Sequence, residues 1–337
     1  MTEPILRVDD LRVEFPGPRG TVHAVAGASF EVQPGSALGL VGESGSGKSM
    51  TLRAMLGLLP APGRTAGGRI LYRGRELTAL SQRELREVRG SEISMVFQEP
   101  MTALNPVRRV GDQIAEAPRV RLGYSRSRAR ARALELLQLV GVPGAARRLD
   151  AYPHELSGGL RQRVMIAIAL SAEPKVLLCD EPTTALDVTI QDQILKLLTS
   201  LREEQELSLV FVTHDLAVVA QTCDRVAVMY AGRVLEEGPV DAVFREPRHP
   251  YTLGLLRSVP DVDDVHGRLE SIGGSPPDLV NPPPGCPFHP RCPFAQDDCV
   301  RPAAVEPRPA GAGRTTACVH PDRAAESVRE DPVIRAA

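Results

Sequence analysis

The segment from Gly42 to Ser49 reads Gly-Glu-Ser-Gly-Ser-Gly-Lys-Ser and fits the pattern G-x-x-x-x-G-K-[ST]. Glycines at these positions let the backbone wrap an anion, so that successive N–H groups point at a phosphate. Lys48 would bridge the β- and γ-phosphates of a nucleotide, and the Ser49 hydroxyl would ligate magnesium. The predicted nucleotide contacts here are Gly42, Ser44, Gly45, Ser46, Gly47, Lys48, Ser49 and Thr51. Because many enzyme classes share this loop, it predicts only a bound nucleotide.

Apolar runs beside this loop and further along the chain would position these and other polar groups. Ala37 to Val41 is a buried-strand candidate that leads into the loop, and a helix is expected from Lys48 to about Leu59. A second apolar run, Val176 to Cys179, ends in Asp180 and Glu181. A third run, Leu207 to Thr213, ends at His214. Ligands bind at the carboxyl ends of such strands, so these side chains are candidates for the same site.

The remaining elements favour an α/β fold with a largely parallel sheet. Ile5 to Phe15 and Ala24 to Val32 read as strands joined by a Pro/Gly-rich turn. Residues from about Asp112 to Val140 read as helices, with an Arg-rich stretch that is interpreted as a solvated helix face. Arg225 to Glu237 reads as a hairpin that turns at Ala231-Gly232.

Leu156 to Arg163, with the sequence Leu-Ser-Gly-Gly-Leu-Arg-Gln-Arg, is the most discriminating stretch. Ser157 can cap the helix that follows, and two glycines leave its N-terminus open to an anion. The stretch resembles the LSGGQ signature of the ABC ATPase family, with Leu160 where Gln is commonest. The resemblance implies that Ser157, Gly158 and Gly159 contact the γ-phosphate of ATP held by a partner subunit, so that two subunits enclose two nucleotides.

Further residues follow in the order of this family, and the resemblance gives each a role. Asp180 would support magnesium together with Ser49 and Gln98, and Glu181 would be the general base that polarises the attacking water. His214 would contact the γ-phosphate. Gln98, after a strand-like run, would sense magnesium and the γ-phosphate. Lys48, Gln98, Glu181 and His214 are the predicted catalytic residues, and Asp187 of Ala185-Leu186-Asp187 is predicted to line the dimer interface and the ATP site.

Phe15 resembles the aromatic residue that stacks on adenine, with Val25 packing beside it. An isolated Phe in a strand is as readily a core residue, and both interpretations stay open.

The resemblance implies a P-loop NTPase fold of the ABC type, with a RecA-like α/β core, an antiparallel β subdomain and a helical subdomain. The expected ATPase domain spans residues 1–245, with the helical subdomain at about 100–165. A small loop-rich C-terminal domain would span 246–325, and 326–337 would be a flexible tail. This boundary rests on composition, because 17 of the 30 prolines and four of the six cysteines follow Gly238.

Several stretches resemble one branch of the family, the dipeptide, oligopeptide and nickel importers. They are Phe97 to Pro106, His249 to Thr252, Leu255-Leu256, Ser258 to Pro260 and Cys286 to Cys292. The branch implies a second, similar ATPase in a heterodimer, two membrane permease subunits and an extracytoplasmic solute-binding protein. The expected function is ATP hydrolysis that energises peptide uptake. Nickel or another small solute stays an alternative, because the binding protein and the permeases select the substrate.

Cys286, Cys292, Cys299 and Cys318 lack the paired C-x-x-C spacing of most structural zinc sites. Four thiolates suit zinc or an iron–sulfur cluster. The resemblance favours a structural [4Fe–4S] cluster, with zinc or unligated thiols as alternatives and His289 and His320 as fallback ligands.

Composition excludes several classes. The net charge of -2 gives no support for a nucleic-acid binder. The longest uncharged apolar stretch, Val164 to Ala172, is too short to span a bilayer, and Met1 to Asp10 lacks the apolar core of a signal peptide. We therefore expect a protein at the cytoplasmic face of the membrane, held there by its permeases.

ABC ATPases of DNA repair or translation usually carry coiled-coil insertions or a second cassette, which are not found here. A P-loop kinase would lack the signature, and an exporter would not show the importer-like stretches.

Overall fold

The computed structural model describes residues 3–99, 103–183, 187–258 and 271–329. The chain divides into two compact units. Unit 1 comprises Met1–Val32, Ala37–Thr78 and Thr213–Ala337. Unit 2 comprises Gln33–Ser36 and Ala79–Val212. Among the described residues, no helix is both long and apolar enough to cross a bilayer.

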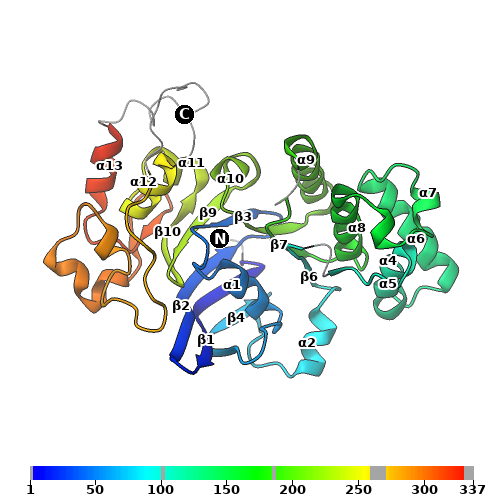
Figure 1. The fold of residues 1–337 in the computed structure, drawn as a ribbon, viewed down its shortest axis with the longest axis horizontal. Coiled ribbons are helices and arrows are strands. Elements are labelled where there is room, and N and C mark those ends of the chain that lie inside the picture. The colour runs from blue at the N-terminus through cyan, green and yellow to red at the C-terminus, as the bar shows by residue number, and fades with distance from the viewer. Residues whose placement is uncertain (1–2, 100–102, 184–186, 259–270, 330–337) are drawn as a thin grey trace. The chain divides into compact units, whose positions relative to one another are not determined.

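An antiparallel sheet in unit 1 has the order β2-β1-β4-β5, and its long strands lie side by side in Figure 1. The strands are β1 (Leu6–Gly17), β2 (Gly20–Val32), β4 (Arg64–Tyr72) and β5 (Arg75–Glu76). In β1, Leu6 and Val8 are buried, but the next buried residues are Leu11 and Val13. The side chains that face the core therefore change from even-numbered to odd-numbered positions within the strand. A register irregularity between Val8 and Leu11, where Asp10 has φ 45°, adds the extra residue that this change requires.

Five further strands of unit 1 form a second ladder: β3 (Ala37–Val41), β9 (Arg225–Tyr230), β10 (Arg233–Pro239), β12 (Thr315–Thr316) and β11 (Arg308–Pro309). β3 and β9 are parallel, and the remaining pairs are antiparallel. The hairpin at Ala231-Gly232 is confirmed, since both residues have positive φ between β9 and β10. The helices of unit 1 are α1 (Lys48–Met55), α10 (Leu216–Thr222), α11 (Val240–Arg245), α12 (Pro250–Arg257) and α13 (Pro321–Arg329).

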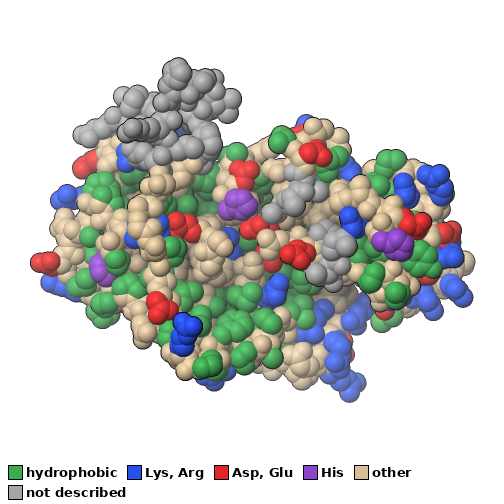
Figure 2. Space-filling model, viewed as in Figure 1, with side chains coloured by type: hydrophobic (Ala, Val, Ile, Leu, Met, Phe, Trp, Pro, Cys, Tyr) green, Lys and Arg blue, Asp and Glu red, His purple; other side chains and the backbone are tan. Residues whose placement is uncertain are grey.

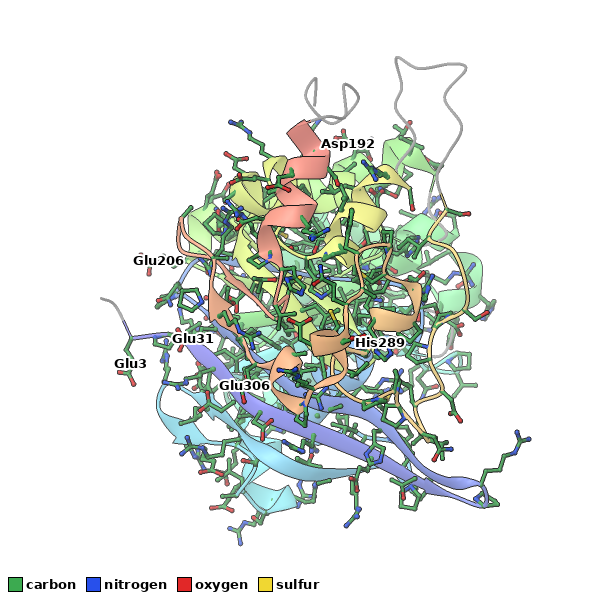
Figure 3. The ribbon with its side chains drawn as sticks, turned by 90° about the vertical axis from the view of Figure 1, so that its left-hand side faces the viewer. Glu3, Glu31, Asp192, Glu206, His289 and Glu306 are labelled. Atoms are coloured by element: carbon green, nitrogen blue, oxygen red, sulfur yellow. The ribbon has the colours of Figure 1, made fainter. Side chains whose placement is uncertain are left out.

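The C-terminal segment is loop-rich, as expected from its prolines. Figure 3 shows it as short turns and loops, with His289 and Glu306 labelled. Its 3-10 turns are η2 (His289–Arg291), η3 (Asp297–Val300) and η4 (Pro302–Val305). Phe288 and Ala317 nevertheless share one apolar cluster with Val41 of β3 and Val228 of β9. The segment therefore packs as part of unit 1, and the boundary near residue 245 stays a prediction.

Unit 2 holds three parallel strands in the order β6-β7-β8: β6 (Ile93–Val96), β7 (Val176–Asp180) and β8 (Ser208–Val212). Every residue of these strands is buried, which is typical of a parallel sheet covered on both faces. The helices are α2 (Gln82–Val88), α4 (Val110–Ile114), α5 (Glu116–Arg121), α6 (Arg126–Leu139), α7 (Ala145–Arg148), the turn η1 (Pro153–Glu155), α8 (Gly158–Leu170) and α9 (Val188–Gln205).

These elements confirm the predicted α/β class. The helix predicted from Lys48 to about Leu59 is shorter in the structure, where α1 ends at Met55. The backbone leaves the helical conformation at Gly57, which has φ 58°, and Pro60 follows three residues later. The Arg-rich stretch lies on α6 and is largely exposed, with Arg130 paired to Asp150 at 2.9 Å. Lys and Arg side chains are visible over this part of unit 2 in Figure 2, which agrees with a solvated helix face.

Candidate functional site

The Gly-rich loop of unit 1 joins β3 to α1 and has a backbone that only glycine can adopt at two positions. Gly42 has φ 148°, and a Cβ there would lie 2.0 Å from the Met229 carbonyl oxygen. Gly47 has φ 102°, and its Cβ would lie 2.4 Å from the Ala24 carbonyl oxygen. Gly47 is the N-cap of α1 and, having no side chain, makes no side-chain cap hydrogen bond at this helix start.

Lys48 folds back over the loop and is only 6% exposed. Its Nζ donates to the carbonyl oxygens of Gly42 at 2.7 Å and Glu43 at 2.9 Å, and to Ser46 Oγ at 3.2 Å. The ammonium group therefore lies within the loop, where phosphate oxygens would compete with these neutral acceptors.

The other predicted loop contacts differ in exposure. Ser44 and Gly45 are exposed, Ser49 is half-buried and Ser46 is buried. Thr51 is fully buried, and its hydroxyl donates to the Gly47 carbonyl oxygen at 3.0 Å. Thr51 thus supports the first turn of α1 in this structure.

Phe15 and Val25, the predicted base contacts, have different surroundings. Phe15 is half-buried on β1, and its ring is so close to Gly63 that a Cβ there would lie 2.5 Å from Phe15 Cε1. Val25 is 1% exposed and belongs to the core of unit 1. This burial gives the predicted Val25 contact with adenine no support, and both contacts stay predictions.

In unit 2, Asp180 and Glu181 stand where β7 ends. Asp180 is 1% exposed, whereas Glu181 is half-buried and has φ 47°, a strained conformation for this residue. The Glu181 N–H donates to the Val212 carbonyl oxygen of β8 at 3.0 Å. Gln98, beyond β6, donates from Nε2 to Glu181 Oε2 at 3.0 Å. The fold thus brings together three residues that the sequence only placed at neighbouring strand ends.

The signature stretch forms the start of α8. Ser157 Oγ accepts from the Leu160 N–H at 3.4 Å, and Ser157 and Gly158 are exposed. The departure at Leu160 leaves this cap intact, because its backbone makes the bond. Gln162 lies buried and donates to the Pro182 carbonyl oxygen, which ties α8 to the turn after Glu181.

Asp187 caps α9, with its Oδ1 accepting from the Ile190 N–H at 2.9 Å. Its predicted neighbours Ala185 and Leu186 lie outside the described residues. His214 belongs to unit 1 and is exposed at a turn before α10, whose N-terminus is capped by Asp215.

All four C-terminal cysteines line one pocket of unit 1, with His249, His289 and His320 also in its wall. All four are free thiols. Burial, with a smaller contribution from the neighbouring thiols, raises the pKa of Cys286 to about 11 and that of Cys318 to about 12. Burial lowers the pKa of the His249 imidazole to about 3, and its Nε2 lies 3.7 Å from Cys286 Sγ. These converging soft sulfur donors fit a thiolate-bound metal, whose binding would release the thiol protons.

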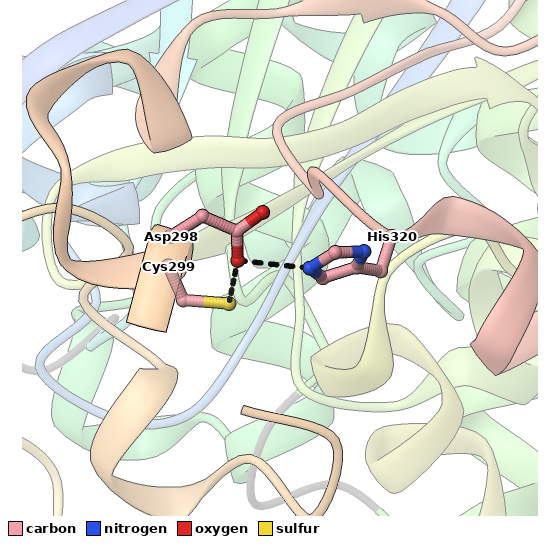
Figure 4. A group of neighbouring side chains, drawn as sticks. All are labelled: Asp298, Cys299 and His320. Carbon is pink, nitrogen blue, oxygen red and sulfur yellow. Dashed lines mark hydrogen bonds and ion pairs between the residues drawn. The ribbon is translucent and has the colours of Figure 1, made fainter. Parts of the chain in front are cut away.

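Asp298 was not predicted from the sequence and lies beside the same pocket. Its Oδ1 is 2.9 Å from His320 Nε2 and 3.8 Å from Cys299 Sγ (Figure 4). The partner His320 lowers the pKa of the Asp298 carboxyl group. This contact with Asp298 engages Nε2 of the His320 ring.

Two known protein families match parts of this chain. Residues 25–184 match the family model described as ABC transporter, and residues 235–299 match the oligopeptide/dipeptide transporter C-terminal region. A bacterial ABC transporter cassette solved as a dimer has a TM-score of 0.63 and 29% identity, covering 70% of this chain and 98% of that one.

Relatives are similar over nearly their whole length. A putative peptide import ATP-binding protein of Brucella abortus (strain 2308) is 51% identical, over 90% of this chain and 92% of the relative. The dipeptide transport ATP-binding protein DppD of Bacillus subtilis is 51% identical, over 89% and 90%. The oligopeptide transport ATP-binding protein OppD of Salmonella typhimurium is 49% identical, over 94% of each chain. The chain therefore belongs to the ABC transporter ATP-binding family, in the branch that carries the oligopeptide/dipeptide transporter C-terminal region.

Proposed function

We propose that this chain is the ATP-hydrolysing subunit of an ABC importer that takes up di- or oligopeptides across the cytoplasmic membrane. The observation that carries the proposal is the placement of Glu181 directly after buried Asp180, with its carboxylate held by Gln98. The relatives named above supply the peptide class, because they are peptide import proteins by name.

In this function, the phosphate loop binds the β- and γ-phosphates of ATP through Lys48 and the backbone N–H groups at the start of α1. Ser49, Asp180 and Gln98 would hold magnesium, which neutralises phosphate charge when it is bound. Glu181 takes a proton from the attacking water, and Gln98 orients the Glu181 carboxylate. His214 hydrogen-bonds the γ-phosphate as its charge spreads.

The exposed Ser157-Gly158 start of α8 docks on the γ-phosphate held by a second ATPase subunit. Asp187, exposed at the start of α9, lines the same interface. We assign that partner to a similar chain in a heterodimer, bound to two permease subunits that hold both at the cytoplasmic face. A solute-binding protein outside the membrane delivers the peptide.

Cys286, Cys292, Cys299 and Cys318 bind a [4Fe–4S] cluster in this proposal, and zinc is the alternative ligand of the same thiols. The role of the group is structural, because the surrounding segment is rich in proline and short turns and needs a cross-link. Their convergence on one pocket supports the assignment.

The test is uptake of a labelled dipeptide, and separately of labelled nickel, by cells whose only copy of the gene encodes Glu181→Gln. Loss of peptide uptake with nickel uptake intact is the expected result. Loss of nickel uptake alone would move the assignment to metal import. Retention of both would contradict the transport function, provided that the variant protein is present at its normal level.

A further inference from the structure

Glu43, the second residue of the phosphate loop, is held by an ion pair from the C-terminal segment. Arg291 Nη1 lies 2.7 Å from Glu43 Oε2, and Arg291 Nη2 lies 3.0 Å from Glu43 Oε1. Both residues belong to unit 1 and are 248 positions apart. The pair is bidentate, so it fixes the orientation of the Glu43 carboxylate as well as its distance from the Arg291 guanidinium group.

Arg291 itself has little freedom. Its side chain is 5% exposed. Nε donates to the Gly273 carbonyl oxygen at 2.8 Å, Nη2 to that of Ile272 at 3.1 Å, and Nη1 to Tyr230 Oη at 3.1 Å. Every nitrogen of the guanidinium group therefore donates to a residue other than Glu43, and Nη1 and Nη2 also donate to Glu43. These contacts make the Arg291 side chain a rigid anchor for the loop.

The backbone of Glu43 is held as well. Its N–H donates to Tyr251 Oη at 2.7 Å, and its carbonyl oxygen accepts from Lys48 Nζ at 2.9 Å. Tyr251 is fully buried on α12. Two residues that follow the ATPase motifs in the sequence thus fix a loop residue that contacts the phosphate-binding lysine.

We propose that Arg291 and Tyr251 are positioning residues for nucleotide binding, acting through Glu43 on the geometry of the phosphate loop and Lys48. The inference rests on the proposed function, since it requires that this loop bind ATP. A Gly-rich loop has many accessible conformations, and anchoring one residue lowers the entropy lost when the phosphates bind. The C-terminal segment therefore sets nucleotide affinity in addition to holding its cysteines.

The variants Glu43→Gln and Arg291→Lys test this in the purified full-length chain. Glu43→Gln keeps the side-chain volume and is remote in sequence from the cysteines, and Arg291→Lys keeps the charge but loses the two-pronged contact. The readouts are the Kd of a fluorescent ATP analogue, the KM and kcat for ATP, the Tm, and bound iron and zinc.

We expect each variant to raise the Kd for ATP about tenfold, with a larger effect on KM than on kcat and with unchanged metal content. The Kd for ATP of the double variant should be no higher than that of the single variant with the higher Kd, because both substitutions remove the same contact. Tyr251→Phe removes only the hydroxyl that accepts the Glu43 N–H and should raise the Kd about threefold.

Arg314→Lys is the matched control. The Arg314 side chain is also 5% exposed and lies in the same segment, but it bonds the carbonyl oxygens of Ala242 at 2.8 Å and Glu246 at 2.6 Å. It should lower the Tm and leave the Kd for ATP unchanged.

An unchanged Kd in Glu43→Gln and Arg291→Lys would overturn the inference. An equal rise in Kd in Arg314→Lys would also overturn it, because the effect would then be general loss of stability. Failure of the unsubstituted chain to bind ATP would instead refute the proposed function.

Discussion

Gln98 Nε2 donates a 3.0 Å hydrogen bond to Glu181 Oε2, and the two residues are 83 positions apart in the sequence. The bond joins the residue beyond β6 to the acid that follows β7. Because these strands are parallel neighbours, their carboxyl ends meet at one edge of the sheet. The contact restrains the Glu181 carboxylate, as the proposed role of this residue as general base requires.

Glu181→Gln should bind ATP with nearly normal affinity and hydrolyse it at least about 10²-fold more slowly. The amide keeps the shape of the side chain but cannot accept a proton from water. Single-turnover hydrolysis and equilibrium ATP binding measure the two effects separately. Turnover near that of the unsubstituted protein would remove Glu181 from the role of base.

Gln98→Ala should lower kcat about tenfold, because it removes a donor to the Glu181 carboxylate. The phosphate loop is unaltered, so ATP affinity without magnesium should stay within about twofold of normal. The combined Gln98→Ala and Glu181→Gln variant should lose less in kcat than the product of the two single losses, because Gln98 acts partly through Glu181 and partly as a proposed magnesium ligand. Additive losses would show that Gln98 acts independently of Glu181.

Gly42→Ala should abolish ATP binding and lower the free energy of unfolding by roughly 3 kcal/mol or more, since its Cβ would lie 2.0 Å from the Met229 carbonyl oxygen. Gly35→Ala is the control, with φ +68° and no atom within 4 Å of the added Cβ. It should cost about 1 to 2 kcal/mol and leave binding intact. Urea unfolding and ATP titration measure these effects, and equal losses in both variants would contradict the argument from the clash.

Glu236 predicts a pH dependence of stability. Burial raises the pKa of this carboxyl to about 7, although the N–H groups of Arg248 and His249 donate to it. Between about pH 4.5 and 7 the unfolded chain loses this proton and the folded chain keeps it, so rising pH lowers stability through this window.

The free energy of unfolding of the unsubstituted protein minus that of Glu236→Gln should therefore be larger at pH 5 than at pH 7.5. The change in this difference should be roughly 1 to 3 kcal/mol. Comparing the two proteins at each pH cancels the other titrating groups. Urea unfolding at both pH values is the measurement, and a difference between the proteins that does not change with pH would contradict the raised pKa.

Replacing Cys286, Cys292, Cys299 or Cys318 by Ser should each lower the iron and sulfide, or the zinc, bound to anaerobically purified protein. All four line one pocket, so losing one soft ligand weakens the whole site. Cys223→Ser is the control, because this half-buried cysteine is not among the described residues that line the pocket and its Sγ lies close to Gly39 of β3. Equal metal content in all five variants would contradict the four-cysteine site.

Several features of this protein follow from local sequence alone. The Gly-Lys-Ser loop, the apolar strand that ends at Asp180 and Glu181, and the Ser157 cap of α8 are each encoded within about ten residues. Periodicity, turn residues and caps act over such distances, so their positions agree with the structure. The Ala231-Gly232 hairpin was predictable for the same reason.

Local patterns failed where a backbone detail or a neighbour decided the outcome. The strand prediction for Ile5 to Phe15 gave no sign of the irregularity at Asp10, which shifts the inward phase of β1. The predicted end of α1 at about Leu59 overlooked the stop at Gly57. Both depend on single residues with positive φ, which weigh little in a pattern averaged over a window.

Only the tertiary structure decided which distant residues meet. The sequence by itself determined the fold class, the phosphate loop and the order of the motifs, because these depend on residue type and short spacing. It contained no signal that Arg291 would pair with Glu43, 248 positions away. This contact depends on how the C-terminal segment packs against β3 and β9 in one apolar cluster. That packing brings Arg291 to Glu43 only when the whole core of the unit has formed.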